Sequence, residues 1–500
     1  MRAMLWRIPL GLVAGVIGAL VFPTENLWYL TPLIPMLATL AILGAKPIGS
    51  FVIGFATGQA FYISHVEWLS LYLGPVPLLA LSTLMAIYFG LGSALTSWLY
   101  LRLKVRGPAA FSFAFLAAAV WTLREFVANN FPYGGFPWSR LAMTQSESFL
   151  ANWVWLGGMS LLTFVIALLG TMAALWLKHR ADRKIRLRRM LIATAAILLI
   201  PVVMPIGITT QQSGERVIAA VQGDANAGLF SNVTPGTILQ NHIDATELVF
   251  QSDLADQVEL LVWPENASDL DPLRSVMANE KIEQIAAKID APFTFGTITR
   301  AGDDTYNSTL LWQSEVGLVD QYDKKVPVPF AEYAPDREFW RMFAPDLVDM
   351  IPRGFSFGQR DGIFELPGFS AGTLICFEIA EDSILRELVS GGAEVILSQT
   401  NNADFGYSDE TYQQIAIARL RAIETGRGVV NISTVGKSAI FLPSGDILSQ
   451  VDWYEPAVMV ERVPTFTGNT PAVFIGSVFD WINAGFVLVS SALAFGRRRR

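Results

Sequence analysis

The sequence predicts a polytopic α-helical membrane bundle of about eight spans that carries one α/β domain. Hydrophobic residues make up 52% of the chain and charged residues only 16%, which is far from the composition of an ordinary soluble enzyme. Long apolar runs occupy both ends of the chain. Between them, short β-branched runs alternate with helical patterns, which is typical of a buried sheet covered by helices.

Eight apolar runs supply the predicted spans. Several reach the length of about 20 residues that a helix needs to cross the bilayer core, and the shorter ones contain Gly and Pro. No small-residue cleavage site follows the first run, so we interpret it as a span and not as a signal peptide. The runs are 9–22, 28–44, 49–64, 76–101, 111–127, 152–177, 189–207 and 472–495.

Basic residues orient these spans. If the N-terminus is cytoplasmic, the inside segments hold seventeen Lys and Arg residues, whereas the short outside connections hold only Arg140. This bias requires an even number of spans. The predicted organisation is a transmembrane bundle of seven spans at 1–209, an extracytoplasmic catalytic domain at 210–470, and an eighth span with a basic cytoplasmic tail at 471–500.

The central segment shows the local patterns of an α/β domain. Helical patterns at 275–289 and 411–426 separate some of its strand-like runs, and the second pattern ends at Gly426, as a helix C-cap should. The strand-like runs are 216–223, 258–265, 293–299, 308–312, 371–377 and 393–401.

Composition also excludes several classes of partner and site. The net charge of −8 argues against nucleic acid as a partner. A single cysteine excludes an internal disulfide and a Cys-cluster zinc site. The three histidines, His65, His179 and His242, are far apart in the sequence, so we expect no histidine metal site.

Three polar features follow predicted strands, where α/β enzymes place their reactive groups. Glu265 follows VELLVWP, Lys324 and Lys325 follow Tyr322-Asp323, and Cys376 stands at a strand-to-helix turn in AGTLICFEIAED, where Glu378 begins an acidic first helical turn. A thiol needs a base to become a nucleophile, and His242 lies on an ordinary helix face, so a carboxylate is the remaining candidate. A lysine ammonium can stabilise an oxyanion.

Each of these residues also has a purely structural interpretation. A lone cysteine is most often a small core residue, Glu265 alone is a cap or a surface acid, and Lys324 alone is a solvated charge. Their joint occurrence is what favours acyl-transfer chemistry. The apolar stretch 337–351 also has two interpretations: a lid that dips into the membrane interface, or an ordinary packed helix.

The motifs WPEN, YDKKVPVPFAEYAP and LICFE, in this order and spacing, resemble the nitrilase (carbon–nitrogen hydrolase) superfamily. Within it, eight spans around one such domain are similar to the apolipoprotein N-acyltransferases. Further agreeing segments are GGFPW (134–138), VQGDAN (221–226), YNS (306–308), VPFAE (328–332) and ARLRAIETGR (418–427).

The resemblance implies an αββα sandwich with a catalytic triad of Glu265, Lys324 and Cys376, supported by Glu332 and Glu378. It implies a two-step transfer through a cysteine thioester, from a membrane phospholipid to the N-terminal α-amine of a diacylated lipoprotein. It further implies a monomeric, multi-pass protein of the bacterial inner membrane that uses no metal or soluble cofactor.

Some positions depart from the family pattern. Lys325 competes with Lys324 as the catalytic lysine, and counting back eight residues from Glu332 selects Lys324. Phe377 stands where family members frequently have tyrosine, and Asp404 where they commonly have tryptophan. These departures leave the substrate preference unassigned. Two rival functions remain: a membrane-anchored amidase that uses water as acceptor, and a catalytically idle membrane or transport protein.

Overall fold

The computed structural model describes residues 6–107, 109–179, 183–228, 234–351 and 354–496. The chain forms two compact units, Met1–Ile206 with Pro471–Arg500, and Gly207–Thr470. We describe each unit by itself. Arg2 and the four terminal arginines, which contribute to the predicted orientation, lie outside the described residues.

The first unit is helical, and each of the eight apolar runs falls on a helix. Its α-helices are α1 Arg7–Val16, α2 Gly18–Val21, α3 Leu33–Ile42, α4 Pro47–His65, α5 Leu69–Leu73, α6 Pro75–Arg102, α7 Ala109–Ala128, α8 Trp153–Lys178, α9 Arg183–Val203 and α16 Pro471–Gly496. Its 3₁₀ turns are Trp28–Leu30, Pro137–Ser139, Leu141–Gln145 and Phe149–Asn152.

Within the described residues, four helical segments are long and apolar enough to cross a membrane. They are Pro75–Arg102, Ala109–Ala128, Phe149–Lys178 and Pro471–Gly496. Two shorter apolar segments, Arg7–Val21 and Trp28–Ile42, fall below that length. A bundle of eight spans therefore stays a prediction.

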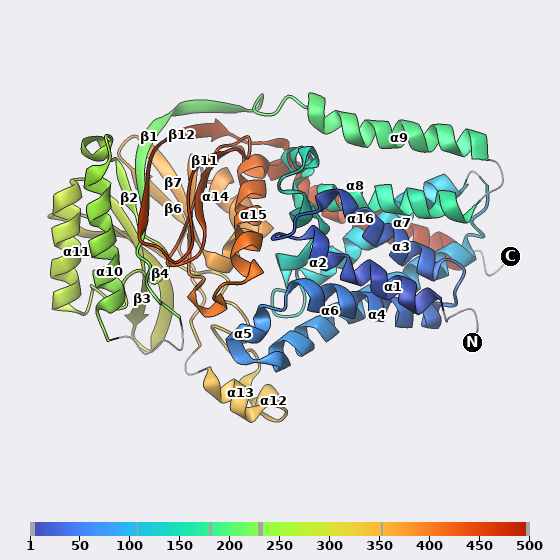
Figure 1. The fold of residues 1–500 in the computed structure, drawn as a ribbon, viewed down its shortest axis with the longest axis horizontal. Helices are drawn as coiled ribbons and strands as arrows, with labels where there is room; N and C mark the ends of the chain where they lie inside the picture. The colour runs from blue at the N-terminus through green and yellow to red at the C-terminus, as the bar shows by residue number, and fades with distance from the viewer. Residues whose placement is uncertain (1–5, 108, 180–182, 229–233, 352–353, 497–500) are drawn as a thin grey trace. The chain divides into compact units, whose positions relative to one another are not determined.

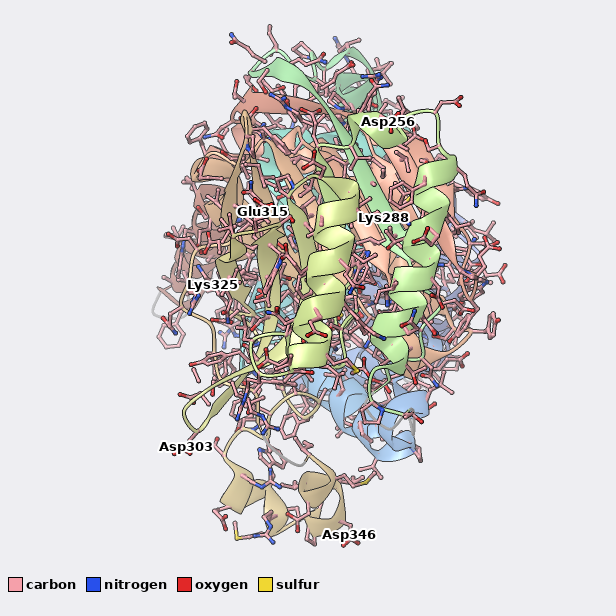
Figure 2. All side chains as sticks on the ribbon, turned by 90° about the vertical axis from the view of Figure 1, so that its left-hand side faces the viewer. Asp256, Lys288, Asp303, Glu315, Lys325 and Asp346 are labelled. Atoms are coloured by element: carbon pink, nitrogen blue, oxygen red, sulfur yellow. The ribbon has the colours of Figure 1, made fainter. Side chains whose placement is uncertain are left out.

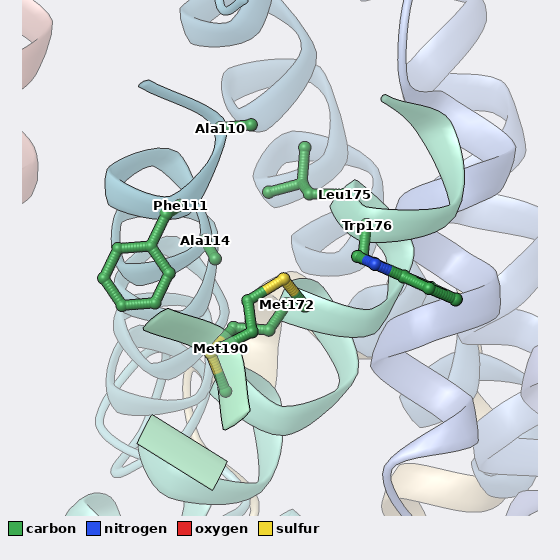
Figure 3. A pocket seen from close by; sticks show the side chains of 7 residues that line it. All are labelled: Ala110, Phe111, Ala114, Met172, Leu175, Trp176 and Met190. Atoms are coloured by element: carbon green, nitrogen blue, oxygen red, sulfur yellow. The ribbon is translucent and has the colours of Figure 1, made fainter. Parts of the chain in front are cut away.

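Small residues let the helices of this unit approach closely, as is common in membrane bundles. A Cβ added at Gly58 of α4 would come within 2.7 Å of the Phe89 Cβ on α6. One small apolar pocket lies between α7, α8 and α9 (Figure 3). It is lined by Ala110, Phe111, Ala114, Met172, Leu175, Trp176 and Met190.

The second unit contains two six-stranded sheets, with strand orders β12-β1-β2-β3-β4-β5 and β11-β10-β9-β8-β7-β6. The first sheet comprises β1 Thr210–Gln222, β2 Leu260–Val262, β3 Phe293–Ala301, β4 Asp304–Gln313, β5 Gly317–Asp323 and β12 Ala457–Gly468. The second comprises β6 Ile363–Leu366, β7 Phe369–Ile375, β8 Val395–Thr400, β9 Gly428–Ser433, β10 Ser438–Phe441 and β11 Ile447–Val451.

Helices cover the outer face of each sheet (Figure 1). The helices α10 Thr237–Thr246 and α11 Val276–Ile289 lie outside the first sheet, and α14 Asp382–Ser390 and α15 Asp409–Thr425 lie outside the second. One buried core, which includes Val262, Ile375 and Val430, lies between the sheets. A second core, which includes Leu261 and Ile282, lies under α10 and α11. The predicted α/β sandwich is confirmed.

The six strand-like runs coincide with strands β1, β2, β3, β4, β7 and β8, and α15 ends at Thr425 with Gly426 at φ +65°, as predicted. One local expectation is corrected. Residues 378–382 do not form the first turn of a single helix, because Glu378 lies in the 3₁₀ turn Cys376–Ala380 and α14 begins only at Asp382. The turn is tight because Glu378 bonds back to the Ile375 N–H at 2.9 Å.

Residues 337–351 form two short helices, α12 Arg337–Arg341 and α13 Pro345–Met350, and not one packed helix. Their apolar side chains are largely outside the core: Met342 is 70% exposed and Phe343 is 69% exposed. An ordinary packed helix would bury this face. Insertion of the segment into a membrane interface stays a prediction.

Gln399, on β8, is a buried side chain that joins the two sheets. Its Nε2 donates to the Trp263 carbonyl at 2.6 Å, and its Oε1 accepts from the hydroxyls of Thr309 at 3.0 Å and Thr373 at 2.9 Å. Trp263 follows β2 and Thr309 lies on β4, whereas Thr373 lies on β7. Gln399 therefore fixes the first sheet against the second.

We predict that Gln399→Leu lowers stability strongly, because it leaves three buried polar groups without their partner at about 1–3 kcal/mol each. The measurement is the thermal unfolding midpoint of the full chain in detergent. Gln450→Leu, at an exposed position on β11 of the same sheet, is the matched control and should change the midpoint little. Equal midpoints for the two variants would contradict the proposed link.

Candidate active site

The ends of three strands supply the thiol, the lysine and the first carboxylate of the site. Glu265 follows β2 by three residues, Lys324 follows β5 directly, and Cys376 follows β7 directly. The approach to Glu265 is rigid, because the Trp263 N–H donates to the Thr294 carbonyl at 2.8 Å and the Trp263 indole donates to the Thr246 hydroxyl at 2.9 Å. Packing therefore fixes the carboxylate before any substrate arrives.

The Lys324 ammonium lies between two carboxylates. Its Nζ is 2.9 Å from Glu332 Oε2 and 3.7 Å from Glu265 Oε1, and the residue is only 2% exposed. Asn307 on β4 joins the two acids, since its Nδ2 donates to Glu265 at 2.7 Å and to Glu332 at 3.0 Å. Glu332 also accepts the Val328 N–H at 2.7 Å.

Burial and charge shift the pKa values of this cluster in ways that suit acid–base chemistry. Burial raises the pKa of Glu265 to about 7, against the opposing effect of the Lys324 ammonium. Burial alone would lower the pKa of Lys324, but the carboxylates of Glu332 and Glu265 outweigh it and raise that pKa above its ordinary value. The lysine therefore stays cationic while Glu265 titrates near neutrality.

Cys376 occupies the left-handed region at φ +54°, an uncommon conformation for a residue with a side chain. Such strain persists only where the surrounding structure imposes it, and it clusters at functional sites. The thiol is half-buried and close enough to the Glu265 carboxylate for the two groups to interact electrostatically, and Gln414 Nε2 lies 3.9 Å from its Sγ. Burial and then the Glu265 carboxylate raise the pKa of Cys376, so the thiol stays protonated until a base removes its proton.

Glu378, fully buried, binds mainly backbone groups at the site. It accepts the N–H groups of Lys325 at 2.7 Å and Val326 at 3.1 Å, in addition to Ile375 and the Tyr322 hydroxyl at 3.0 Å. One side chain thus holds the segment that carries Lys324 against the turn that carries Cys376. Its role is to position both.

The two adjacent lysines point to different surroundings. Lys325 extends to Glu387, with Asp361 at 3.9 Å, and it lies at the surface of the α/β unit (Figure 2). Of the two lysines, only Lys324 forms an ion pair with Glu265.

Several polar residues of the site carried no assigned role in the sequence prediction. Asn307 lies in the segment YNS, which agreed with the family pattern, but its bridge between two acids depends on contacts across 42 and 25 residues. Glu410 and Gln414 on α15 gave no distinct sequence signal. Burial raises the pKa of Glu410 to about 8, and the negative charge of Glu265 contributes.

His242 lies outside this chemistry, as its place on a helix face predicts. It is fully buried on α10, its Nδ1 lies 2.9 Å from the Ile238 carbonyl, and burial lowers its pKa to about 4. Among the described residues, no group of three His, Cys, Asp or Glu side chains is arranged to hold a metal ion. What the site offers is a thiol, a base that titrates near neutrality and a fixed cation, the set required for nucleophilic acyl transfer.

Both parts of the chain match known protein families. The apolipoprotein N-acyltransferase N-terminal domain matches residues 14–172, and the carbon-nitrogen hydrolase domain matches residues 217–468. An apolipoprotein N-acyltransferase of Mycolicibacterium smegmatis is 31% identical, over 86% of this chain and 75% of its own. Proteins of the same name from Vibrio parahaemolyticus (26% identical, 98% of each chain) and Shewanella oneidensis (27% identical, 99% of this chain and 96% of its own) match nearly end to end.

The raised pKa of Glu265 predicts a pH-dependent loss of stability. The folded protein binds this proton more tightly than the unfolded chain, whose carboxyl has the ordinary pKa of 4.5, so the stabilisation is complete below pH 4.5 and is lost as the pH rises through about 7. At 1.36 kcal/mol per pKa unit, the loss is on the order of 3 kcal/mol. Glu265→Gln cannot titrate and should therefore gain stability relative to wild type between pH 5 and pH 8.

The measurement is the thermal unfolding midpoint of both proteins in detergent at pH 5 and pH 8. Glu247→Gln removes an exposed carboxylate that pairs with Lys288 at the surface, and it is the matched control. Glu410 also titrates, and the charge of Glu265 contributes to its pKa, so the same comparison is repeated in a Glu410→Gln background. A difference between Glu265→Gln and wild type that is the same at both pH values would refute the assignment.

Proposed function

This chain belongs to the apolipoprotein N-acyltransferase family, and from that premise we propose that Cys376 carries an acyl group from a membrane phospholipid to the N-terminal α-amine of a diacylglyceryl-cysteine lipoprotein. The observation that carries the proposal is the convergence of thiol, carboxylate and ammonium: the charges of Glu265 and Lys324 both act on the Cys376 thiol, and Glu265 lies 3.7 Å from Lys324. These three residues form the catalytic triad, and Glu332, Asn307 and Glu378 hold it in place.

In the first step, Glu265 takes the proton of the Cys376 thiol and the sulfur attacks the carbonyl carbon of the sn-1 ester. Lys324 stabilises the oxyanion that develops on the carbonyl oxygen. The ester C–O bond then breaks, and Glu265 returns the proton to the departing alkoxide. The products are a thioester on Cys376 and a lysophospholipid.

In the second step, the α-amine of the lipoprotein attacks the thioester carbonyl. The oxyanion again faces Lys324, the C–S bond breaks, and Glu265 transfers a proton from the amine nitrogen to the sulfur. An amide forms and the free thiol is restored. A base with a pKa near 7 serves both steps, because it can accept and return a proton at neutral pH.

The protein is a membrane protein, and the proposal includes its topology. Eight spans place both termini in the cytoplasm and the α/β unit outside the bacterial inner membrane, where phospholipid and lipoprotein substrates meet. The bias of seventeen basic residues against one supports this orientation. We propose that the protein acts as a monomer.

The decisive experiment is intact mass of the purified full chain after incubation with phospholipid. Wild type should gain one acyl group and Cys376→Ala none. Lys324→Met should lose on the order of 100- to 1000-fold in the rate of adduct formation, as expected for a donor aimed at an oxyanion. Lys325→Met, which loses a partly exposed ion pair, should stay within several-fold of wild type.

If Lys325→Met abolished adduct formation and Lys324→Met did not, the catalytic lysine would be Lys325 and not Lys324. Residual acylation of Cys376→Ala above background would remove the nucleophile from the proposal. Addition of a diacylated lipopeptide then identifies the acceptor: the acyl group should appear on the lipopeptide amine. Release of free fatty acid at the same rate with and without lipopeptide would instead favour the membrane-anchored hydrolase.

The topology makes a separate prediction. In a Cys376→Ala background, single cysteines at the exposed positions Glu147 and Asp303 should react with a membrane-impermeant thiol reagent in intact cells with an opened outer envelope. A cysteine at the exposed Lys104 should react only after lysis. Labelling of Lys104→Cys in intact cells would refute the orientation.

A further inference from the structure

Buried polar side chains from α15 and the end of β8 face the Cys376 sulfur, and the mechanism above does not use them. They are Asn402, Glu410 and Gln414, each 2% exposed or less. Glu410 and Gln414 are four residues apart and therefore lie on the same face of α15. The question is which way their amide groups point, since an amide donates at one end and accepts at the other.

The carboxyl of Glu410 fixes the amide of Asn402. Asn402 Nδ2 donates to Glu410 Oε2 at 2.6 Å, and Asn402 Oδ1 accepts from the Ser433 hydroxyl at 2.5 Å. Turning this amide over would place its oxygen against the carboxyl oxygen. A protonated Glu410 keeps this arrangement when its acidic hydrogen is on Oε1, because Oε2 then still accepts from Asn402.

The amide of Asn402 in turn fixes the amide of Gln414. The same Asn402 Nδ2 donates to Gln414 Oε1 at 2.7 Å, and the Thr400 hydroxyl donates to that oxygen at 2.9 Å. With its oxygen held by two donors, Gln414 must direct its NH₂ group away from them. That group lies 3.9 Å from Cys376 Sγ, within hydrogen-bonding range of a sulfur atom.

We infer that Gln414 is a further catalytic residue, whose carboxamide donates a hydrogen bond to the sulfur of Cys376 and stabilises the thiolate, and that Asn402 is the positioning residue that aims this donor. The inference deepens the proposed function, on which it rests for the role of the thiolate. The ammonium of Lys324 favours the thiolate through its charge, and Gln414 adds a hydrogen-bond donor to the sulfur.

The charges around the sulfur explain why such a donor matters. Burial and the Glu265 carboxylate disfavour ionisation of the thiol, whereas the Lys324 ammonium favours it. Burial raises the pKa of Glu410 to about 8, so at neutral pH this acid is mostly protonated and aims the amides without adding a charge that opposes the thiolate. A neutral donor such as Gln414 stabilises the thiolate without disturbing the pairing of Lys324 with Glu332.

The single cysteine of the chain allows a direct test that needs no lipid. Alkylation of detergent-purified full chain by iodoacetamide, followed by intact mass from pH 7 to 9, reports only Cys376, and its rate follows the thiolate fraction. Gln414→Met removes the donor at similar volume and should slow alkylation at each pH roughly threefold to tenfold, as expected for loss of one hydrogen bond of typical strength. Gln413→Met, at the neighbouring buried glutamine of α15, should leave the rate within twofold.

The positioning role has its own signature. Asn402→Leu should slow alkylation in wild type but add nothing further in a Gln414→Met background, because both changes act through one donor. Additive effects of the two substitutions would refute this role. Gln414→Glu keeps the side-chain shape and places an oxygen against the sulfur, so it should slow alkylation at least as much as Gln414→Met, and it decides the question if Gln414→Met does not fold.

A folded Gln414 variant that keeps the wild-type alkylation rates overturns the inference and leaves the proposed function intact. If the Gln414 variants are alkylated more slowly but wild type never acquires an acyl group from phospholipid, the role of Gln414 as a donor stands and the proposed function is overturned. The two failures are therefore distinguishable in one set of variants.

Discussion

A lysine ammonium can be buried only beside compensating charge, and the arrangement of the site depends on that constraint at Lys324. Glu332 at 2.9 Å supplies the compensation, Glu265 lies slightly farther away, and Asn307 holds both acids. Each partner comes from a different stretch of chain, so the cluster closes only when β2, β4 and the end of β5 are in register. The chemistry and the stability of the sandwich thus share one set of contacts.

The two carboxylates of this cluster have different environments and therefore different tasks. Glu332 makes the closer ion pair and accepts a backbone N–H from Val328, so it serves as the counter-charge. Glu265 is deeper, and burial raises its pKa to about 7, which leaves it free to exchange a proton with the thiol. A carboxyl group whose surroundings raise its pKa toward neutrality, beside a fixed cation, is a recurrent acid–base catalyst.

Relative placement of the two sheets is the second requirement, because Glu265 and Lys324 belong to one sheet and Cys376 to the other. Gln399 joins the sheets through Trp263, Thr309 and Thr373, and Glu378 joins the Lys324 segment to the Cys376 turn. Both are buried polar side chains whose bonds are made across the interface. Buried polar contacts of this kind tolerate little displacement, since an unpaired partner is costly.

The sequence by itself determined the apolar runs that become helices, six of the twelve strands of the sandwich, and the positions of Glu265, Lys324 and Cys376 after strands, because periodicity, turn residues and short motifs are local properties. It also selected Lys324 over Lys325 by spacing from Glu332. Only the tertiary structure showed that Glu378 braces two backbone segments, that Asn307 bridges two acids, and that Asn402 and Glu410 aim Gln414 at the thiol. These roles depend on which side chains meet after folding and on the direction of each amide, and no local pattern encodes either.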